Sequence, residues 1–306
     1  MISVVLTTYN GSNCIIDQLE SLRLQTKEID EVIILDDKST DHTVNIVQEF
    51  IKAYNLTKWQ IIVNEHNIGW KRNFIKGINL SKGKIILTCD QDDIWMPYKV
   101  EVISSILCLH PEINVLTTSW INWDGKKLNL SRACKKDDPS IALEKKDVKY
   151  NYLYNPAPGC VMAFRRTFYN RIIDCWQEDF PHDAFLYRAG IFTDSLYHLD
   201  EPMIYWRRHN KSSFSLDLKG QRTKKGKRDW IEYAFRVNKS IRIIEKKCDI
   251  IKYDYIIDLC DKWLHQRLKF YDTRSFLQWI RLIPLLKVYP KKSQLLTDII
   301  YAYKDK

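Results

Sequence analysis

The stretch "IILTCDQDDIWMP", residues 85–97, decides the fold. An apolar run typical of a buried strand ends there in three carboxylates within four positions, Asp90, Asp92 and Asp93. A helix cap needs one carboxylate, and three crowded together repel one another unless a cation joins them. In a chain whose formal net charge is +10, this local gathering of negative charge indicates a cation site where the strand stops.

Strands and helices alternate on both sides of that stretch. The predicted strands are Ile2–Thr8, Glu31–Asp37, Trp59–Asn64 and Lys84–Cys89. The predicted helices are Asn13–Gln25, Thr40–Tyr54, Lys71–Ser81 and about 97–110. This alternation is typical of βαβ units, and short apolar runs fit strands covered on both faces. We therefore expect an α/β fold with a mainly parallel sheet and helices on both faces.

The rhythm changes after about residue 120. A polar, Lys- and Asp-rich stretch (125–150) predicts a loop, 159–166 a strand, and 167–176 and 183–189 helices. A basic segment, 217–229, precedes a part that is predicted to be helical to the end. We therefore expect two domains. One is a catalytic domain over 1–215, with a nucleotide-binding half of about 1–120 and an acceptor half of about 121–215; the other is a basic helical extension over 216–306.

The composition limits the compartment. The 8 Cys are scattered without a Cys-x-x-Cys pair or zinc-ligand spacing, which indicates a reducing compartment. The beginning, "MISVVLTTYN", lacks a basic region and is typical of a first strand, not of a signal peptide. No apolar run is long enough for a membrane span, so a cytoplasmic protein is expected, with a peripheral position on the inner face of the cell membrane as the refinement.

Polar residues gather at the carboxyl ends of the predicted strands, where open α/β sheets bind ligands. Thr7 and Tyr9 end the first strand, Asp36 and Asp37 the second, and the aspartates around Asp90 the fourth. Neither a Gly-x-Gly-x-x-Gly fingerprint nor a P-loop is present to hold phosphate. Carboxylates can instead hold Mg²⁺ or Mn²⁺, which bridges to phosphate oxygens. The residues thus predict a metal and diphosphate site.

Four segments, "VVLTTYNG", "VIILDDKSTDHT", "NEHNIGWKRNFIKGI" and "CDQDDIWMP", resemble the successive motifs of family-2 glycosyltransferases of the GT-A fold. The DQDDIW form is similar to rhamnosyltransferase-like proteins of bacterial surface-polysaccharide clusters. The resemblance covers about the first 210 residues. It implies a metal-dependent, inverting transfer of a hexosyl or deoxyhexosyl group from a nucleotide-diphospho-sugar to an acceptor hydroxyl. The acceptor would be a saccharide or a lipid-linked saccharide, in the synthesis of a cell-surface polysaccharide or glycolipid.

The resemblance also implies roles by position. Asp90-Gln91-Asp92 matches the Asp-x-Asp motif, with Asp92 as the best metal ligand and Asp90 beside it. The residues expected to bind the donor are Thr7, Tyr9, Asp36, Asp37, Lys71, Asn73 and Asp90, with Tyr9 against the base.

Two later segments complete the expected site. In "FPHDAFLYRAG" the resemblance makes Asp183 the base that takes the acceptor proton, preceded here by His182; Glu178 and Asp179 are weaker candidates, and helix capping by Asp183 stays open. In "YWRRHNKSS", Arg207 and Arg208 are expected to hold diphosphate and His209 to be a third metal ligand.

The C-terminal third matches none of these motifs. Its Lys and Arg clusters with interleaved aromatics fit either a helical appendage with solvated basic faces or a surface that docks on an anionic membrane. No motif supports nucleic-acid binding. Two other functions stay open: a sugar-phosphate nucleotidyltransferase, which would need a Gly-rich signature that 6–13 lacks, and an inactive carbohydrate- or membrane-binding scaffold, against which Asp90, Asp92 and Asp183 argue.

Overall fold

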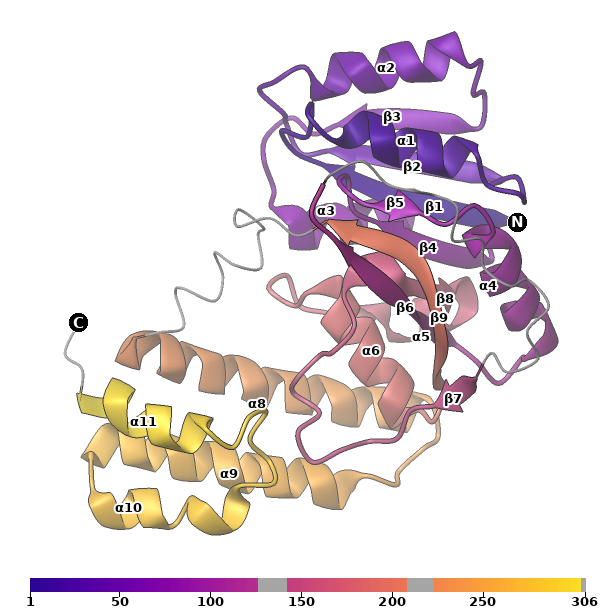
Figure 1. Cartoon of the computed structure of the whole chain (residues 1–306). Helices are drawn as coiled ribbons and strands as arrows, with labels where there is room; N and C mark the ends of the chain where they lie inside the picture. Colours follow the sequence, from indigo (N-terminus) through magenta and orange to yellow (C-terminus); the bar gives the residue numbers. More distant parts are fainter. Residues whose placement is uncertain (126–141, 208–222, 304–306) are drawn as a thin grey trace. The chain divides into compact units, whose positions relative to one another are not determined.

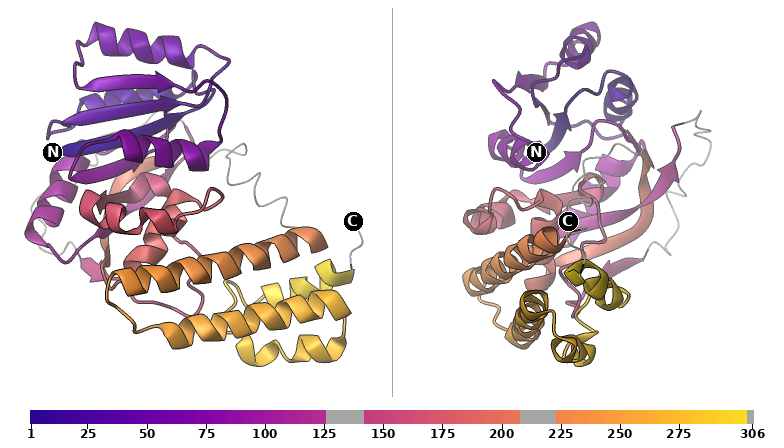
Figure 2. Two further views of the ribbon diagram at one scale, coloured as in Figure 1. Left: turned by 180° about the vertical axis from the view of Figure 1, so that it is seen from behind. Right: turned by 90° about the vertical axis from the view of Figure 1, so that its left-hand side faces the viewer.

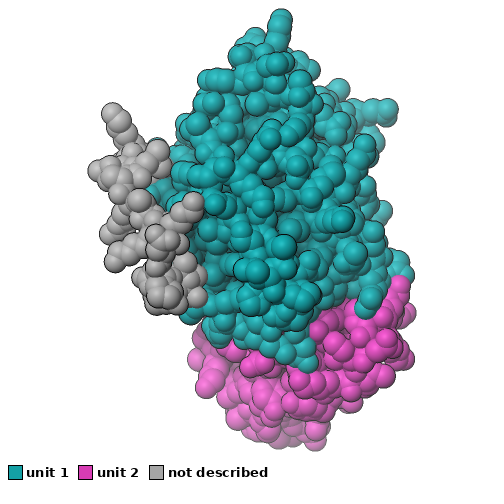
Figure 3. All heavy atoms as spheres, turned by 90° about the vertical axis from the view of Figure 1, so that its right-hand side faces the viewer, with its two compact units in different colours: residues 1–146, 157–190, 194–208 teal, residues 147–156, 191–193, 209–306 magenta. Residues whose placement is uncertain are grey.

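The computed structural model describes residues 1–125, 142–207 and 223–303. The chain divides into two compact units (Figure 3). Unit 1 comprises 1–146, 157–190 and 194–208, and unit 2 comprises 147–156, 191–193 and 209–306. The predicted domain boundary between residues 215 and 216 lies outside the described residues and stays a prediction.

Unit 1 is built on one mixed sheet, which has nine strands in the described residues. These are β1 (Ile2–Thr8), β2 (Glu31–Asp36), β3 (Trp59–Val63), β4 (Ile85–Cys89), β5 (Ile94–Trp95), β6 (Val115–Trp123), β7 (Leu143–Lys145), β8 (Met162–Arg165) and β9 (Leu196–Arg207). Their order is β3-β2-β1-β4-β8-β6-β9-β5, with β7 on β9 (Figure 1). The first four in that order are parallel, and their carboxyl ends share one edge.

Helices pack on this sheet. They are α1 (Ile15–Arg23), α2 (Thr43–Ala53), α3 (Trp70–Leu80), α4 (Lys99–Leu109), α5 (Arg166–Ile172) and α6 (His182–Phe192), with short 3₁₀ turns η1 (Gly159–Val161) and η2 (Ile173–Cys175). α1 lies in front of the parallel strands in Figure 1, and α3 in front of them in the reverse view of Figure 2. The two helices therefore cover opposite faces, as short right-handed crossovers require.

Burial explains the sequence pattern of the parallel strands. Every residue of β1 and of β2 is buried, and Val4, Val5 and Leu6 have no exposed surface. Strands covered on both faces gain apolar burial from every position, so they need an apolar run and not alternation. β3, at the sheet edge, is only partly buried.

The predicted fold class is confirmed as an α/β fold with helices on the sheet, while the half beyond β4 is mixed. β8 is antiparallel to β4 and β6, and β6 and β9 pair in parallel with register shifts near Ser119. The prediction did not contain β6 and β9. Polar residues interrupt both strands, so neither shows the apolar run that marks β1 or β4. The predicted strand over 159–166 begins as a 3₁₀ turn and becomes β8.

The described residues of unit 2 from 223 onward are mainly helical. They form α8 (Lys224–Lys247), α9 (Asp254–Thr273), α10 (Phe276–Ile280), η3 (Ile283–Leu285) and α11 (Gln294–Tyr303). α8 and α9 lie side by side (Figures 1 and 2). Their apolar stripes form the core, where Ile241, Ile257 and Trp263 are almost completely buried. In the described parts of the chain, no helix has the length and apolar character that crossing a membrane requires.

Candidate active site

The ends of β1 and β4 are joined by an amide side chain. Gln91 Oε1 accepts a hydrogen bond from the Tyr9 backbone N–H at 2.9 Å, and Gln91 Nε2 donates to the Tyr9 carbonyl at 3.1 Å. The Tyr9 side chain is 46% exposed, and the Thr7 side chain beside it is buried. The expected donor residues of β1 therefore lie next to the Asp-x-Asp segment, with the tyrosine ring accessible to a ligand.

Asp36 organises the turn that follows β2. Its carboxylate accepts hydrogen bonds from the Thr8 hydroxyl, the Ser39 hydroxyl and the Ser39 backbone N–H. The side chain has no exposed surface. These contacts give Asp36 a structural task, and its expected part in donor binding stays a prediction.

Asp37 and Asn73 hold the loop that leads into α3. Asp37 accepts from the backbone N–H groups of Ile68 and Gly69 and from the Asn64 amide, each at 2.8 Å. Asn64 also donates to Asn73, which donates in turn to the Leu35 carbonyl. Both residues are buried and fix this loop, and their expected part in donor binding stays a prediction.

The acidic cluster lies at the end of β4. Asp90, Asp93 and Cys160 each offer one ligand atom, and these atoms lie within 4.8 Å of one another. Among the described residues this group does not include Asp92, whose expected role as a metal ligand stays a prediction. His209, the expected third ligand, and Arg208 lie outside the described residues. Sequence reasoning passed over Asp93 as a ligand and did not consider Cys160.

The carboxylates of this cluster resist ionisation. Burial raises the pKa of Asp93 to about 7, and the Asp92 carboxylate adds to the shift. Burial also raises the pKa of Asp90 well above its ordinary value, with further contributions from Asp93, Asp92 and Asp183. Asp93 Oδ1 accepts from the Arg207 N–H at 3.1 Å, whereas Oδ2 is buried without a hydrogen-bond partner in the described residues. Such an arrangement stores repulsion that a cation would relieve.

A buried lysine partly balances this charge. The Lys99 side chain has no exposed surface, and burial lowers its pKa to about 8. Its Nζ donates to the Cys160 carbonyl at 2.7 Å and lies 3.6 Å from the centre of the Trp95 ring. The ammonium is therefore held by neutral groups next to the cluster, and Asp93 Oδ2 keeps its free lone pairs.

The oxygen donors fit Mg²⁺ or Mn²⁺, since carboxylates are the ligands that these hard ions prefer. The thiol fits less well. Burial raises the pKa of the Cys160 thiol, as do Asp93 and Asp90, and sulfur suits softer metal ions than Mg²⁺ or Mn²⁺. The unpartnered Asp93 Oδ2 is the feature that a bound cation would satisfy.

Arg207 ends β9 against this region. Its Nε donates to the Asp92 carbonyl at 2.8 Å, and its guanidinium pairs with Asp17 at 3.0 Å. The guanidinium carbon also lies 4.1 Å from the centre of the Trp123 ring. These contacts fix the turn that carries the aspartates, and the expected contact of Arg207 with diphosphate stays a prediction.

Asp183 lies in the first turn of α6. Its Oδ1 accepts from the N–H of the next residue, Ala184, at 2.7 Å, which lies within the first turn, and the capping interpretation stays a prediction. Burial raises the pKa of Asp183 to about 6, while Arg188 and Lys71 lower it. Because Asp183 also raises the pKa of Asp90, the two carboxylates interact electrostatically. The expected base, the acidic cluster and Lys71 at the start of α3 are thus brought together.

His182 is a packed side chain. Its ring stacks on Phe74 with centroids 3.9 Å apart, and both ring nitrogens are buried without a partner among the described residues. Burial lowers its pKa to about 3, so the ring is neutral. A Cβ on Gly159 would lie 2.5 Å from His182 Nε2, which explains why a glycine precedes Cys160.

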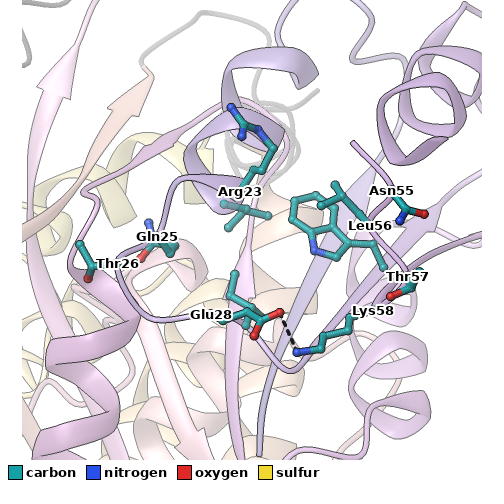
Figure 4. A pocket seen from close by; sticks show the side chains of 11 residues that line it. Arg23, Gln25, Thr26, Glu28, Asn55, Leu56, Thr57 and Lys58 are labelled. Carbon is teal, nitrogen blue, oxygen red and sulfur yellow. Dashed lines mark ion pairs between the residues drawn. The ribbon is translucent and has the colours of Figure 1, made fainter. Parts of the chain in front are cut away.

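A separate hollow of about 320 Å³ lies at the opposite edge of the sheet, where β3 begins (Figure 4). It is lined by the end of α1 and by residues 55–59, and the Lys58–Glu28 ion pair of 2.7 Å crosses it. None of the expected site residues lines it, so it does not belong to the candidate active site.

A mixed α/β sheet with an accessible tyrosine after β1 and carboxylates at the end of β4 is the arrangement expected of a nucleotide-sugar transferase. The chain belongs to glycosyl transferase family 2, whose family model matches residues 3–173. It is therefore a glycosyltransferase, as the motifs predicted.

Relatives with names agree with this class. The dTDP-rhamnosyl transferase RfbG of Shigella flexneri is 28% identical over 229 residues, which are 70% of this chain and 74% of the relative. An uncharacterized glycosyltransferase of Haemophilus influenzae is 25% identical over 252 residues, 80% of this chain and 77% of the relative.

Solved structures show the same fold. The S. aureus TarS structure in complex with UDP-GlcNAc has a TM-score of 0.61 at 17% identity and covers 99% of this chain and 89% of its own. The mannosyltransferase PcManGT of Pyrobaculum calidifontis, in complex with GDP-Man and Mn²⁺, has a TM-score of 0.57 at 14% identity, with 100% and 87% covered. Both likenesses extend over the C-terminal helices.

Proposed function

We propose that this glycosyltransferase is metal-dependent and inverting, and that it transfers a sugar from a nucleotide-diphospho-sugar to an acceptor hydroxyl in the synthesis of a surface polysaccharide or glycolipid. The observation that carries the proposal is the buried acidic cluster at the end of β4, with an unpartnered Asp93 oxygen and with Asp183 close enough to raise the pKa of Asp90. The donor class is supported by the similar proteins: RfbG is a dTDP-rhamnosyl transferase, and the TarS and PcManGT structures are complexes with UDP-GlcNAc and GDP-Man.

Asp90 and Asp92, with Asp93 behind them, hold Mg²⁺ or Mn²⁺ in this proposal. The ion, when bound, supplies positive charge that stabilises the leaving diphosphate as the glycosidic bond breaks. The protein's own part is to hold the carboxylates in place through Gln91 and Arg207, whose hydrogen bonds fix the chain on both sides. Tyr9 offers its exposed ring to the base of the donor.

Asp183 acts as the base. An acceptor hydroxyl is a poor nucleophile until its proton has an acceptor, and a carboxylate with a pKa of about 6 is ionised at neutral pH and still basic enough to receive it. Lys71 and Arg188 keep the carboxylate ionised, because both lower its pKa. The hydrogen bond that Asp183 accepts from the Ala184 N–H is compatible with this role, since it uses only Oδ1.

The acceptor is proposed to be a lipid-linked saccharide at the inner face of the cell membrane. The basic character of the C-terminal part supports this position, because each Lys or Arg near an anionic surface contributes about 1 kcal/mol.

The test is a panel of dTDP-rhamnose, UDP-GlcNAc and GDP-mannose, each with Mg²⁺, Mn²⁺ or EDTA, scored first by thermal stabilisation. A ligand that binds only the folded protein raises its apparent stability. One donor should stabilise the wild type in the presence of metal, and Asp92→Asn should lose that metal-supported part. Stabilisation that is unchanged in EDTA and in Asp92→Asn would contradict metal dependence.

A further inference from the structure

The helix pair α10–α11 presents an apolar face to solvent. Its members are Phe276, Leu277 and Ile280 on α10 and Leu296, Ile300 and Tyr303 on α11. Phe276, Leu277, Leu296 and Ile300 are each 59% to 68% exposed. Contiguous exposed apolar side chains on a folded protein mark an interaction site. These six residues are called the α10–α11 face.

The two helices form one surface. Trp279 Nε1 donates to the Leu295 carbonyl at 2.9 Å at one end of the pair, and the Tyr303 hydroxyl donates to the Arg274 carbonyl at the other. On α11, Leu296, Ile300 and Tyr303 are spaced by four and three residues, which places them on one side of the helix.

α9 holds this surface rigidly. Gln266 donates to the Gln278 carbonyl at 2.8 Å and so fixes α10. Asp298 of α11 accepts from the Arg267 Nε at 2.9 Å and from the Tyr271 and Tyr289 hydroxyls at 2.7 and 2.8 Å. The exposed side chains are therefore presented by helices that are anchored through buried polar contacts, not by a frayed end.

Within the chain segment that carries the face, the accessible charges have one sign. Between residues 274 and 303 the basic residues are Arg274, Arg281, Lys287, Lys291 and Lys292. The one carboxylate in that span, Asp298, is fully buried and paired with Arg267. Lys291 and Lys292 are exposed in the segment that leads into α11. An apolar face next to basic residues is complementary to a partner that has an apolar interior and a negatively charged surface.

We propose that the α10–α11 face docks on an anionic phospholipid bilayer, with the apolar side chains among the acyl chains and the basic residues at the headgroups. Charge decides between this occupant and a second copy of the chain, because a symmetric dimer through this face would bring two basic borders together. The inference deepens the proposed function, since it names the surface that would bring the site to a lipid-linked acceptor.

The experiment is sedimentation of the whole protein with vesicles of phosphatidylcholine, alone or with about 30 mol% phosphatidylglycerol. The wild type should bind the anionic vesicles at least tenfold more strongly, and about 0.5 M NaCl should weaken that binding. Leu296→Gln with Ile300→Gln should lower it about tenfold, because apolar insertion is lost. The matched control is Leu109→Gln, which changes an apolar residue of unit 1 that is 76% exposed and should bind as wild type.

A second pair of variants separates the electrostatic contribution to vesicle binding from the apolar one. Lys291→Gln with Lys292→Gln should weaken binding to anionic vesicles about tenfold and leave the weak binding to neutral ones unchanged. Lys82→Gln with Lys84→Gln, which removes two exposed lysines of unit 1, is its control.

Three outcomes would overturn the proposal: no vesicle binding by the wild type, equal binding to neutral and anionic vesicles, or full binding by the Leu296 and Ile300 double variant. Light scattering could instead show that the wild type is a dimer and that the Leu296 and Ile300 double variant is a monomer. Together with an absence of vesicle binding, that result would assign the face to a second copy of the chain. Because vesicle binding needs no turnover, Asp92→Asn should sediment as wild type. Failure of the catalytic proposal is thus separable from failure of this one.

Discussion

Two buried carboxylates, Asp93 in unit 1 and Asp298 in unit 2, have opposite surroundings. Asp298 receives four hydrogen bonds, two from Arg267 and one each from Tyr271 and Tyr289. Asp93 lies among other carboxylates, and its Oδ2 has no partner within the described residues. Each of the two side chains is fully buried.

The difference separates a structural charge from a functional one. A buried ion pair with all its lone pairs satisfied holds elements together, and breaking it leaves an uncompensated charge. A crowded carboxylate with one unpartnered oxygen destabilises its own fold and keeps a site prepared for an external cation. Removing the two carboxyl charges should therefore change stability in opposite directions.

The largest expected effect is on unit 2. Asp298→Asn leaves the Arg267 guanidinium buried without its counter-charge, and about 3–5 kcal/mol of unfolding free energy should be lost. Urea unfolding followed by tryptophan fluorescence measures it, because Trp263 lies 4.7 Å from the Arg267 guanidinium carbon. Asp258→Asn removes one of the two aspartates that pair with Arg242; its side chain is 70% exposed, so the change should cost about 1 kcal/mol or less. Equal losses in the two variants would contradict the structural role of Asp298.

The second effect is on catalysis in unit 1. Asp183→Asn keeps an oxygen that can accept from the Ala184 N–H but removes the base, so transfer should fall about 100-fold or more while donor affinity stays near wild type. Glu178→Gln is the matched control. Glu178 is a solvent-exposed partner of Arg72, and its loss should leave the rate unchanged. If the Asp183→Asn enzyme transfers at the normal rate and the Glu178 variant does not, the base has been assigned to the wrong carboxylate.

The same residue predicts the pH dependence. Its pKa of about 6 means that transfer should fall about tenfold for each pH unit below about 6 and level off above it. Asp90, Lys71 and Arg188 are the charged groups that act on this carboxylate.

The stability of the protein should depend on pH in the opposite direction. Burial raises the folded-state pKa of Asp183 above its ordinary value, so the contribution of this group to stability is present at low pH and is lost as pH rises through about 6. Transfer rates of wild type and Asp183→Asn between about pH 5 and 8 check the predicted rate dependence, since the rate of the variant should not fall in the same way below about pH 6.

The third effect tests Asp93 directly. Asp93→Asn should raise the stability of the metal-free protein at about pH 8 by about 1–2 kcal/mol, because it removes a buried charge that repels its neighbours. Wild type in EDTA should lose stability between about pH 4 and 7, as the raised pKa of about 7 requires, and the variant should lose less. Mn²⁺ should stabilise wild type more than the variant. A variant that is less stable than wild type in EDTA would give Asp93 the same structural role as Asp298.

The smallest effect is expected at His182. Because neither ring nitrogen has a partner in the described residues and the ring stacks on Phe74, His182→Phe should change stability by about 1 kcal/mol or less and transfer by no more than a few-fold. His182→Ala, which leaves a cavity beside Phe74, should cost about 2 kcal/mol or more. A large loss of transfer in the Phe variant alone would mean that an imidazole nitrogen takes part in the reaction.

The parallel half of the fold could be predicted because β1, β2 and β4 are buried on both faces and therefore consist of apolar runs. β9 could not, because its alternating polar residues serve different neighbours at each position, from His198 beside Thr117 to Arg207 beside Asp92. The carboxylates at the end of β4 could be located from the sequence because they directly follow an apolar run, whereas the roles of Asp90 and of Asp183 in α6 stay predictions. The positions of Cys160 and Lys99 could not be located, since these residues approach the cluster only through the folding of η1 and α4.

Gln91 stands at the wildcard position of the Asp-x-Asp pattern, yet its side chain is among the most constrained of the segment. It needs both a donor and an acceptor for Tyr9, and a Cβ on Gly11 would lie 2.3 Å from its Oε1. Glutamate lacks the donor, and asparagine is a methylene shorter. Positions 11 and 91 should therefore covary among related sequences: where 91 is no longer glutamine, 11 is released from glycine. A pattern that writes x between the two aspartates omits this information, although the residue at that position ties the end of β1 to the end of β4.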